Sequence, residues 1–435
     1  MCGIAGIYNN KNSSIDDNLK NMLDIARHRG PDSQGMFING NLGIGMNRLS
    51  IIDLDFGNQP ISSMDNRYQL VCNGEIYNFI ELKEKMRNRG YDFKTKTDVE
   101  VILPLFQFYG IDGFSMLDGM FAFAIYDSLS GKLYLCRDRY GIKPLYYYER
   151  QKGEFFFASE IKSILKLNKD LQKNEIAIID YLINGFNSSI ETVWKGVKSL
   201  SPGSCFVLDK NTRKEKLFYK ENKVEPYENR GEAKLHLKEA IIGDINSQLI
   251  SDVPLGVFLS GGIDSSIILG VITKILGKKV PSFSIDFNEK YFSESDKFTS
   301  VAKAFKSEHF IYKVNSDLLD YVNDVIISCD EPFGDVAALP TFLLSQNASQ
   351  SIKVALSGDG SDEIMYGYSY NSIDSKNKRF LENERFHDFI KDFPIYHIKQ
   401  FSLLSRTKSK VDGKPKNLYD ILSSKIVKNF DNYIS

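Results

Sequence analysis

The 435-residue sequence contains few cysteines, and their arrangement argues against a disulfide-stabilised fold and against a cysteine-based zinc site. The five cysteines, Cys2, Cys72, Cys136, Cys205 and Cys329, are odd in number, widely spaced and never arranged as Cys-x-x-Cys. Such a set forms neither a disulfide framework nor a zinc ribbon. We therefore expect a reduced, cytoplasmic protein.

The sequence also lacks an excess of charge and any long apolar run. Lys plus Arg is 55 and Asp plus Glu is 56, which gives a net charge of -1. This balance gives no reason to expect nucleic acid as a partner. No apolar stretch approaches the roughly 20 residues that cross a bilayer, and the start lacks the basic region of a signal peptide. The sequence thus predicts no membrane or nucleic-acid partner.

The first half of the chain has the texture of an antiparallel α+β domain. Between residues 2 and 208, short apolar runs alternate with turns rich in Gly and Asn. The runs 121–126 and 132–136 flank a Gly-containing loop and predict a β-hairpin. Further strands are expected at 42–46, 69–72, 155–157 and 205–208, with helices near 16–28, 78–90 and 98–109.

The second half has the texture of an α/β domain. Residues 209–230 are charged and poor in apolar side chains, so they are the candidate linker before a domain spanning 231–435. A helix is expected near 232–250, with buried strands at 257–259, 283–287, 310–312 and 354–356 between helical segments. This alternation predicts a doubly wound parallel sheet with ligands at the carboxyl ends of its strands.

Cys2 is the first residue with chemical significance. If Met1 is removed, the chain begins with a residue that carries both a thiol and a free α-amine. An α-amine has a pKa of about 7.7–8.0, so it can serve as the base for its own side chain. A lone second-position cysteine would more often be a small buried residue. The surrounding motifs change that interpretation.

Five motifs occur in order: Cys2-Gly-Ile-Ala-Gly, Arg27-His-Arg-Gly-Pro-Asp32, Arg48-Leu-Ser-Ile-Ile52, Asn73-Gly-Glu75 and Thr97-Asp98. Together they resemble the glutaminase domain of class II glutamine amidotransferases. The resemblance implies a four-layer αββα sandwich with an N-terminal nucleophile. It assigns Cys2 as the nucleophile, with Asn73 and the N–H of Gly74 as the oxyanion hole. The implied glutamine-binding residues are Arg48 for the carboxylate, Asp98 for the ammonium, and Leu49, Ser50, Ile51, Ile52, Asn73, Gly74 and Glu75 along the pocket.

A glycine-rich loop follows the first predicted strand of the second half, in Leu259-Ser-Gly-Gly-Ile-Asp-Ser-Ser266. Its backbone N–H groups, with a helix N-terminus behind them, suit phosphate oxygens. Asp264 would repel phosphate unless a cation lay between them, which implies Mg²⁺. The sequence contains no Gly-x-x-x-x-Gly-Lys-Ser/Thr, which argues against a P-loop enzyme. Placed behind a glutaminase domain, the loop resembles that of ATP pyrophosphatases, which cleave ATP to AMP.

A second loop, Val354-Ala-Leu-Ser-Gly-Asp-Gly-Ser-Asp-Glu363, repeats this geometry. The two loops in this order resemble the synthetase site of glutamine-hydrolysing asparagine synthetases. The resemblance implies Mg²⁺–pyrophosphate bound by Asp264 and Asp362, and a role for Asp359 in the acyl-adenylate step. It also implies ATP contacts from Leu259, Ser260, Gly261, Gly262, Asp264, Ser265, Ile285, Ser357 and Gly358.

The resemblance implies that ammonia from glutamine converts adenylated aspartate to asparagine, with ATP and Mg²⁺ required. Asp359 stands where the family often has Glu, Tyr366-Gly-Tyr368 replaces Gly-Gly-Tyr, and the family's later Lys-x-Asp-Arg segment is not found. Two alternatives stay open: an amidotransferase for a sugar or natural-product carboxylate, and a glutaminase-competent subunit with an inactive synthetase half. Family members are often dimers, and the sequence does not decide whether this chain forms a homodimer.

Overall fold

The computed structural model divides into two compact units. The first unit takes residues 1–172, 196–330 and 338–357, and the second takes residues 173–195, 331–337 and those from 358 onward. The residues that the structure describes are 1–9, 14–150, 153–209, 212–221, 225–288, 293–314, 316–335, 337–365, 367, 409–411 and 414–416.

The N-terminal half of the first unit contains two six-stranded antiparallel sheets. The strand order of one sheet is β10 (Val197–Ser199), β8 (Tyr146–Arg150), β9 (Glu154–Ala158), β1 (Gly3–Tyr8), β3 (Leu42–Arg48) and β2 (Ser33–Asn39). The order of the other is β12 (Arg213–Leu217), β11 (Ser204–Leu208), β7 (Lys132–Arg137), β6 (Gly119–Asp127), β5 (Tyr68–Ile76) and β4 (Ile61–Ser62).

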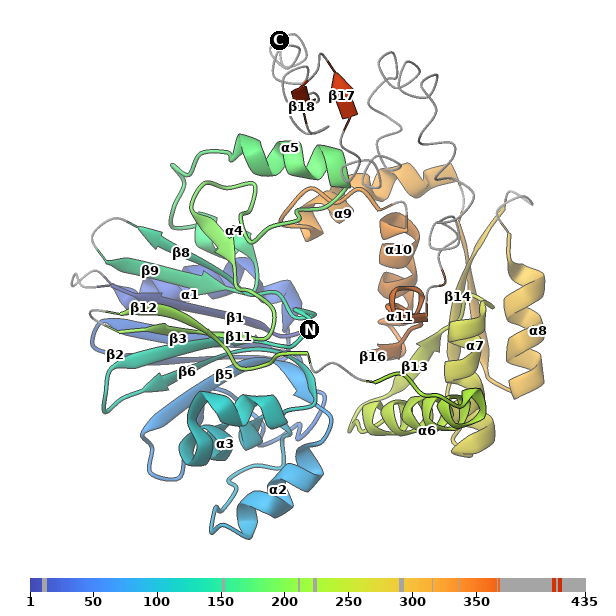
Figure 1. Ribbon diagram of the computed structural model, residues 1–435, viewed down its shortest axis with the longest axis horizontal. Helices are drawn as coiled ribbons and strands as arrows, with labels where there is room; N and C mark the ends of the chain where they lie inside the picture. The colour runs from blue at the N-terminus through green and yellow to red at the C-terminus, as the bar shows by residue number, and fades with distance from the viewer. Residues whose placement is uncertain are drawn as a thin grey trace. The chain divides into compact units, whose positions relative to one another are not determined.

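The two sheets pack face to face, and helices cover their outer faces. Ile4 and Leu42 of one sheet share a buried cluster with Ala122 and Leu135 of the other. Helices α1 (Ile15–Ile25) and α4 (Ile161–Leu165) contact the first sheet, while α2 (Phe79–Arg87) and α3 (Ile102–Tyr109) pack on the second (Figure 1). The expected αββα sandwich is confirmed.

The predicted helices and strands of this half are present, with differences at their ends. The helix expected at 16–28 ends at Ile25 and continues as a 3₁₀ turn over Arg27–Arg29. The helix expected at 98–109 opens with a 3₁₀ turn over Val99–Val101. Strand β12 pairs with β11 inside the range predicted as a linker. Its charged sequence, Arg-Lys-Glu-Lys-Leu, is typical of an exposed edge strand. Because a linker is also charged and poor in apolar residues, the sequence alone did not distinguish the two.

The C-terminal half of the first unit contains a parallel sheet. The sheet order is β15 (His309–Val314), β14 (Ser282–Phe287), β13 (Leu255–Phe258) and β16 (Val354–Leu356). Its helices are α6 (Arg230–Gln248), α7 (Ile263–Gly270), α8 (Ser295–Phe305), α9 (Val322–Ser328) and α10 (Ala338–Ala348). The chain starts at β13, builds outward to β15, and then returns to the other side of β13 as β16. A reversal of this kind opens a crevice at the carboxyl ends of β13 and β16.

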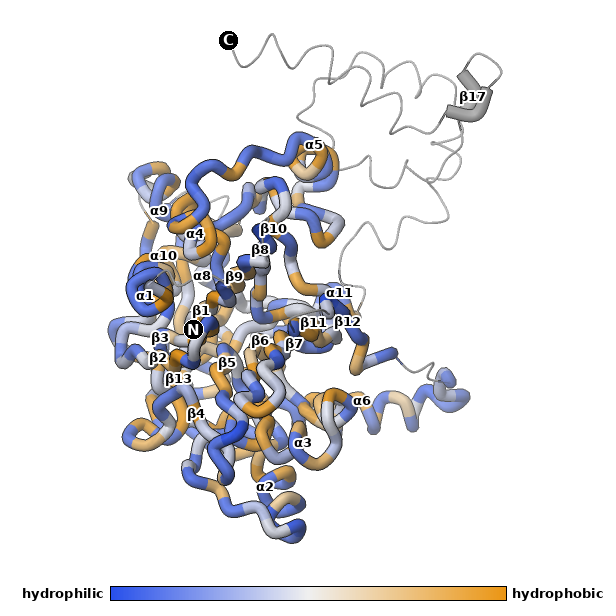
Figure 2. Tube along the Cα trace, turned by 90° about the vertical axis from the view of Figure 1, so that its left-hand side faces the viewer, coloured by the Kyte–Doolittle hydropathy of each residue, from blue (hydrophilic) through white to orange (hydrophobic). Residues whose placement is uncertain are grey.

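The apolar face predicted for the helix at 232–250 is only partly buried. Ile245 and Leu249 are buried, but Leu235 and Leu237 are exposed on 55% and 45% of their surface. Figure 2 shows the corresponding alternation of hydrophilic and hydrophobic segments along α6. Among the described residues, no helix combines the length and apolar character that crossing a bilayer requires.

The second unit contains the remaining regular elements: α5 (Glu175–Asn184), α11 (Ser361–Met365) and the antiparallel pair β17 (Ser409–Val411) and β18 (Lys414–Lys416). Within it, the Glu331 carboxylate accepts hydrogen bonds from the Asn187 side chain and from the Val193 N–H. Short 3₁₀ and π turns elsewhere span Gly110–Met116, Ser316–Tyr321 and Val271–Ile275.

Candidate active sites

Cys2 lies directly before β1, with its sulfur against the backbone of Leu49. The Leu49 N–H donates to Sγ at 3.4 Å, and the thiol lies 3.6 Å from the Leu49 carbonyl oxygen. Burial raises the pKa of the Cys2 thiol, so the nucleophile needs a base at neutral pH. Desolvation lowers the pKa of the Met1 amino group to about 6. The Cys2 nitrogen is part of a peptide bond while Met1 is present, so it can act as a base only after Met1 is removed.

Asn73 and Gly74 are neighbours on β5, and they differ from ordinary strand residues. Asn73 is 1% exposed, and its Nδ2 has no hydrogen-bond partner among the described residues. A buried donor without a partner is unfavourable, and such groups often await a ligand. A β-carbon at position 74 would lie 2.4 Å from the Met120 carbonyl oxygen, so only glycine fits there. Both features suit an oxyanion hole.

Two carboxylates, Glu75 and Asp98, lie close enough for their charges to interact. Asp98 accepts hydrogen bonds from the Ile76 N–H at 2.7 Å and the Thr97 hydroxyl at 3.2 Å. Burial nevertheless raises the pKa of Asp98, and burial together with the charge of Asp98 raises that of Glu75 well above its usual range. A bound ammonium group would offset both effects, so the pair is suited to the amine of an amino acid.

Arg48 holds the loop that follows it. Its guanidinium donates to the carbonyl oxygens of Ile52 at 2.9 Å and Asp53 at 2.7 Å, and to the side chain of Asn58 at 3.3 Å. The residue is 4% exposed. The sequence predicted that Arg48 binds a carboxylate. In the structure it also fixes the backbone of the segment containing Leu49–Ile52, which lines the predicted pocket.

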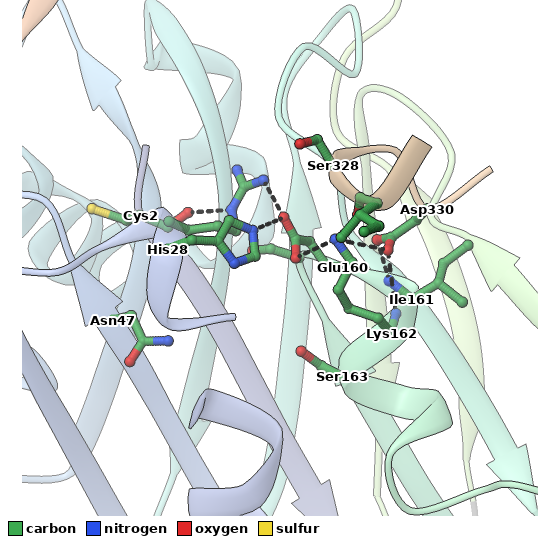
Figure 3. A network of polar contacts seen from close by, with 12 residues as sticks. Cys2, His28, Asn47, Glu160, Ile161, Lys162, Ser163, Ser328 and Asp330 are labelled. Atoms are coloured by element: carbon green, nitrogen blue, oxygen red, sulfur yellow. Dashed lines mark hydrogen bonds and ion pairs between the residues drawn. The ribbon is translucent and has the colours of Figure 1, made fainter. Parts of the chain in front are cut away.

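A polar network behind Cys2 involves residues to which the motifs assigned no role. Arg29 Nε donates to the Cys2 carbonyl oxygen at 2.9 Å, and its Nη1 donates to Glu160 at 3.0 Å. Lys162 pairs with both Glu160, at 3.1 Å, and Asp330, at 3.4 Å. Figure 3 shows the Cys2 carbonyl turned toward this network and the sulfur turned away. The network holds the backbone of the nucleophile through its carbonyl oxygen, and none of its hydrogen bonds involves the thiol.

The second candidate site is the loop between β13 and α7. Gly261 has φ +79°, and a β-carbon there would lie 2.6 Å from the Phe298 backbone nitrogen. The Ser260 hydroxyl lies 3.0 Å from that of Ser265 and accepts from the Gly262 N–H at 3.2 Å. Gly262 precedes the first turn of α7, which contains Asp264. The loop thus combines a turn that requires glycine with a helix N-terminus.

Leu259, Ile285 and Ser357 come from three neighbouring strand ends. Leu259 follows β13, Ser357 follows β16 beside it, and Ile285 lies toward the end of β14. The structure therefore brings these residues to the crevice edge of the sheet, as expected for a nucleotide site. Carboxylate oxygens are ligands that Mg²⁺ prefers, and Mg²⁺ commonly takes one or two of them together with substrate phosphates, so Asp264 fits such an ion.

Comparison with known proteins gives a match to each half of the chain. A glutamine amidotransferase domain model matches residues 1–219, and an asparagine synthase model matches residues 236–418. Glutamine-hydrolysing asparagine synthetase 1 of Bacillus subtilis is 36% identical over 85% of this chain and 59% of its own length. A Methanocaldococcus jannaschii protein, provisionally named glutamine-hydrolysing asparagine synthetase 2, is 36% identical over 85% of this chain and 76% of its own. The chain belongs to the glutamine-hydrolysing asparagine synthetase family.

The chain spans only part of the length of the asparagine synthetases that it matches. It covers 59% of the Bacillus subtilis protein and 65% of asparagine synthetase B of Escherichia coli, to which it is 31% identical. Of the Tyr366-Gly-Tyr368 segment, which differs from the family's Gly-Gly-Tyr, Tyr366 and Tyr368 lie outside the described residues.

The structure brings together some of the predicted site residues of an asparagine synthetase. In the glutaminase half, the Cys2 sulfur lies against Leu49, and the charges of Glu75 and Arg48 act on its thiol. In the C-terminal half, one edge of the parallel sheet carries Leu259, Ser260, Gly261, Gly262, Asp264, Ser265, Ile285 and Ser357. Gly358, Asp359 and Asp362 belong to the second compact unit, so their place in this site stays a prediction.

Proposed function

We propose that this chain is a glutamine-dependent asparagine synthetase. It would hydrolyse glutamine at Cys2, adenylate aspartate with ATP, and form asparagine from ammonia and the adenylate. Two features of the Cys2 site together carry the proposal. The Leu49 N–H donates to Cys2 Sγ, and the buried Asn73 amide has a donor without a partner among the described residues. The family membership supports the synthetase step.

In the first half-reaction, Cys2 sulfur attacks the side-chain amide carbon of glutamine and forms a thioester. Its proton passes to the α-amine of Cys2, which Met1 removal exposes, and then to the departing ammonia. Asn73 Nδ2 and the Gly74 N–H stabilise the negative charge on the amide oxygen as the tetrahedral intermediate forms. Water then hydrolyses the thioester to release glutamate and restore the thiol.

The same pocket would orient glutamine through its two charged ends. Asp98 and Glu75 take the α-ammonium, whose charge stabilises the ionised forms of both carboxylates. Arg48 has a planar fork of donors that suits the α-carboxylate. Because Arg48 also holds the backbone of Ile52 and Asp53, it would link substrate binding to the shape of the pocket.

In the second half-reaction, a carboxylate oxygen of aspartate attacks the α-phosphorus of ATP, and pyrophosphate leaves. The backbone N–H groups of residues 260–262 and the start of α7 would bind the phosphates. Asp264 and Asp362 would hold Mg²⁺, which neutralises phosphate charge when bound. Ammonia then attacks the adenylated carboxyl carbon, and AMP leaves as asparagine forms. Asp359 would assist this step.

The test is a mass balance on the purified chain with glutamine, ATP, Mg²⁺ and aspartate. Mass spectrometry would follow glutamate, AMP and asparagine, and would identify the N-terminal residue. We expect the three products to appear in equal amounts. AMP formed with another carboxylate, but not with aspartate, would support the amidotransferase alternative. Glutamate formed without AMP under any acceptor would support the inactive-synthetase alternative.

Replacing the nucleophile separates the two half-reactions. Cys2→Ala should abolish glutamate formation while leaving asparagine synthesis from added ammonia intact. Cys329→Ala is the matched control, since Cys329 is partly buried and has no assigned role in either site. Loss of both activities in Cys2→Ala, in a protein that remains folded, would contradict the two-site mechanism.

A further inference from the structure

The glutamine loop, defined as residues 49–53, is held from outside the glutaminase half. Two side chains of the C-terminal half reach it, Asp252 directly and Lys353 through Asp32. All of these residues belong to the first compact unit. None of the sequence motifs includes Asp252 or Lys353.

Asp252 is both a hydrogen-bond acceptor and a hydrogen-bond donor to the glutamine loop. Its carboxylate accepts from the Asp53 N–H at 2.8 Å, while its own N–H donates to the Ile51 carbonyl oxygen at 3.0 Å. Asp53 has φ +57°, a backbone conformation that residues other than glycine adopt uncommonly. The Asp252 contacts therefore support a backbone geometry that the loop would not strongly prefer by itself.

Lys353 acts on the other end of the loop. Its Nζ lies 2.8 Å from Asp32 Oδ2, and the same oxygen accepts from the Ser50 N–H at 2.8 Å. Burial raises the pKa of Asp32, but the hydrogen bonds from Lys353 and Ser50 outweigh this and lower it. Asp32 is therefore ionised at neutral pH and connects the lysine to the loop.

These two residues stand at the amino ends of the strands that carry the phosphate loops. Asp252 precedes β13 by three residues, and Lys353 directly precedes β16. The strands are parallel neighbours, with Leu255 opposite Val354, and the Lys353 N–H donates to the Pro254 carbonyl oxygen at 3.1 Å. One pair of strands thus contacts the glutamine loop at its start and leads to the nucleotide site at its end.

We propose that Asp252 and Lys353 are positioning residues of the glutamine pocket, through which nucleotide bound at the phosphate loops changes glutamine affinity. The inference depends on the proposed function, because it assigns glutamine to one end of these strands and ATP to the other. β13 and β16 are joined by a parallel ladder, so a displacement at the carboxyl end of either strand is passed along the pair to its amino end. A shift caused by phosphate binding would therefore move the contacts to Asp53 and Asp32.

The variants Lys353→Met and Asp252→Ala test this coupling in the full chain. We expect each to raise KM for glutamine about three- to tenfold with kcat little changed, because partly exposed ion pairs and single hydrogen bonds contribute modestly. In the native chain, ATP with Mg²⁺ should change this KM at least about twofold. In the variants the ratio of KM for glutamine without ATP to KM with ATP should approach one. Lys353→Arg should restore the native ratio.

Lys279→Met is the matched control, since Lys279 is an exposed lysine just before β14 of the same sheet and makes none of these contacts. It should behave as the native chain. A KM ratio of one in the native chain, or an unchanged ratio in both variants, would overturn the proposal.

Hydrogen–deuterium exchange provides a readout that does not require catalysis. The peptide covering residues 48–58 should exchange more slowly when ATP and Mg²⁺ bind the native chain, and this protection should disappear in Lys353→Met and Asp252→Ala. Absence of protection in the native chain would also overturn the coupling. A native chain that shows protection but forms no glutamate would instead contradict the proposed function.

Discussion

The two candidate sites of this chain use different parts of the polypeptide. Around Cys2 the site is made of side chains: Arg48, Asn73 and Asp98 are 4%, 1% and 3% exposed and come from separate strands and turns. At the phosphate loop the site is made mainly of backbone, on an open edge where Ile263 is 78% exposed. The first site is enclosed between elements, whereas the second lies at strand ends.

This difference determines how each site can be broken. Specificity in the enclosed site depends on buried polar groups, so replacing one side chain should remove function without changing the fold. Phosphate binding at the open site depends on backbone direction, so a change in loop conformation should weaken it. For each site residue the chain offers a residue of the same type in a similar setting outside the site.

The largest effect is expected from a comparison of two buried asparagines. Asn73→Ala removes a donor that lacks a partner among the described residues, and it should lower glutaminase kcat by about 10²–10³. Asn47 is equally buried, but its Nδ2 donates to the Leu23 carbonyl oxygen at 2.6 Å. Asn47→Ala should therefore cost about 1–3 kcal/mol of stability with kcat retained.

The measurements are steady-state glutamate release and chemical denaturation on both variants. If Asn73→Ala lost stability as Asn47→Ala does while keeping kcat, Asn73 would be a structural residue. The oxyanion assignment would then be wrong.

The enclosed site was largely predictable from sequence because its residues cluster in short motifs. Asn73, Gly74 and Glu75 are consecutive on β5, and Arg48 to Ile52 form one continuous segment. Within such a run, a local pattern specifies both residue type and spacing. The supporting residues were not predictable, because Arg29 meets Glu160 and Asp53 meets Asp252 across more than a hundred residues of chain. No local periodicity records such a pairing.

The open edge was predicted for a different physical reason. A strand followed by a glycine loop and a helix specifies the backbone by itself, so the positions of Gly261 and Gly262 followed from sequence order. Strand β12 was missed because an exposed edge strand needs few apolar residues. Helix ends were shifted by a turn where 3₁₀ geometry extends the α-helix.

A smaller effect, on binding, is expected from Asp98→Asn. Loss of a charge-assisted contact to the substrate ammonium should raise KM for glutamine roughly ten- to hundredfold. Asp138 is the structural counterpart, since its buried carboxylate accepts from the N–H groups of Phe121, Tyr140, Ile142 and Lys143. Asp138→Asn should reduce stability and leave KM for the folded fraction near the native value.

The same Asp98 variant has a pH signature in stability. Because burial raises the pKa of Asp98 in the folded state, the folded chain binds this proton more tightly than the unfolded chain does. The contribution of Asp98 to the free energy of unfolding therefore falls as pH rises from about 4 through its folded pKa. Asp98→Asn should gain stability relative to the native chain over that range. Urea denaturation at several pH values measures the difference, and a difference that falls with pH would show that the carboxylate is stabilised as an anion.

The smallest effect is expected at the open site, from two glycines with similar backbone conformation. Gly261 and Gly277 have φ +79° and +65°, so alanine at either position adds a similar backbone strain of about 1–3 kcal/mol. A β-carbon at Gly277 would have nothing within 4 Å, whereas one at Gly261 would press on the Phe298 backbone.

Gly261→Ala should therefore raise KM for ATP about tenfold through loop displacement, since overpacking typically costs about 1–3 kcal/mol. Gly277→Ala should lose stability only, and basal glutaminase activity should persist in both. Equal effects on KM for ATP in the two variants would mean that backbone strain, and not the contact with α8, sets the shape of the phosphate loop.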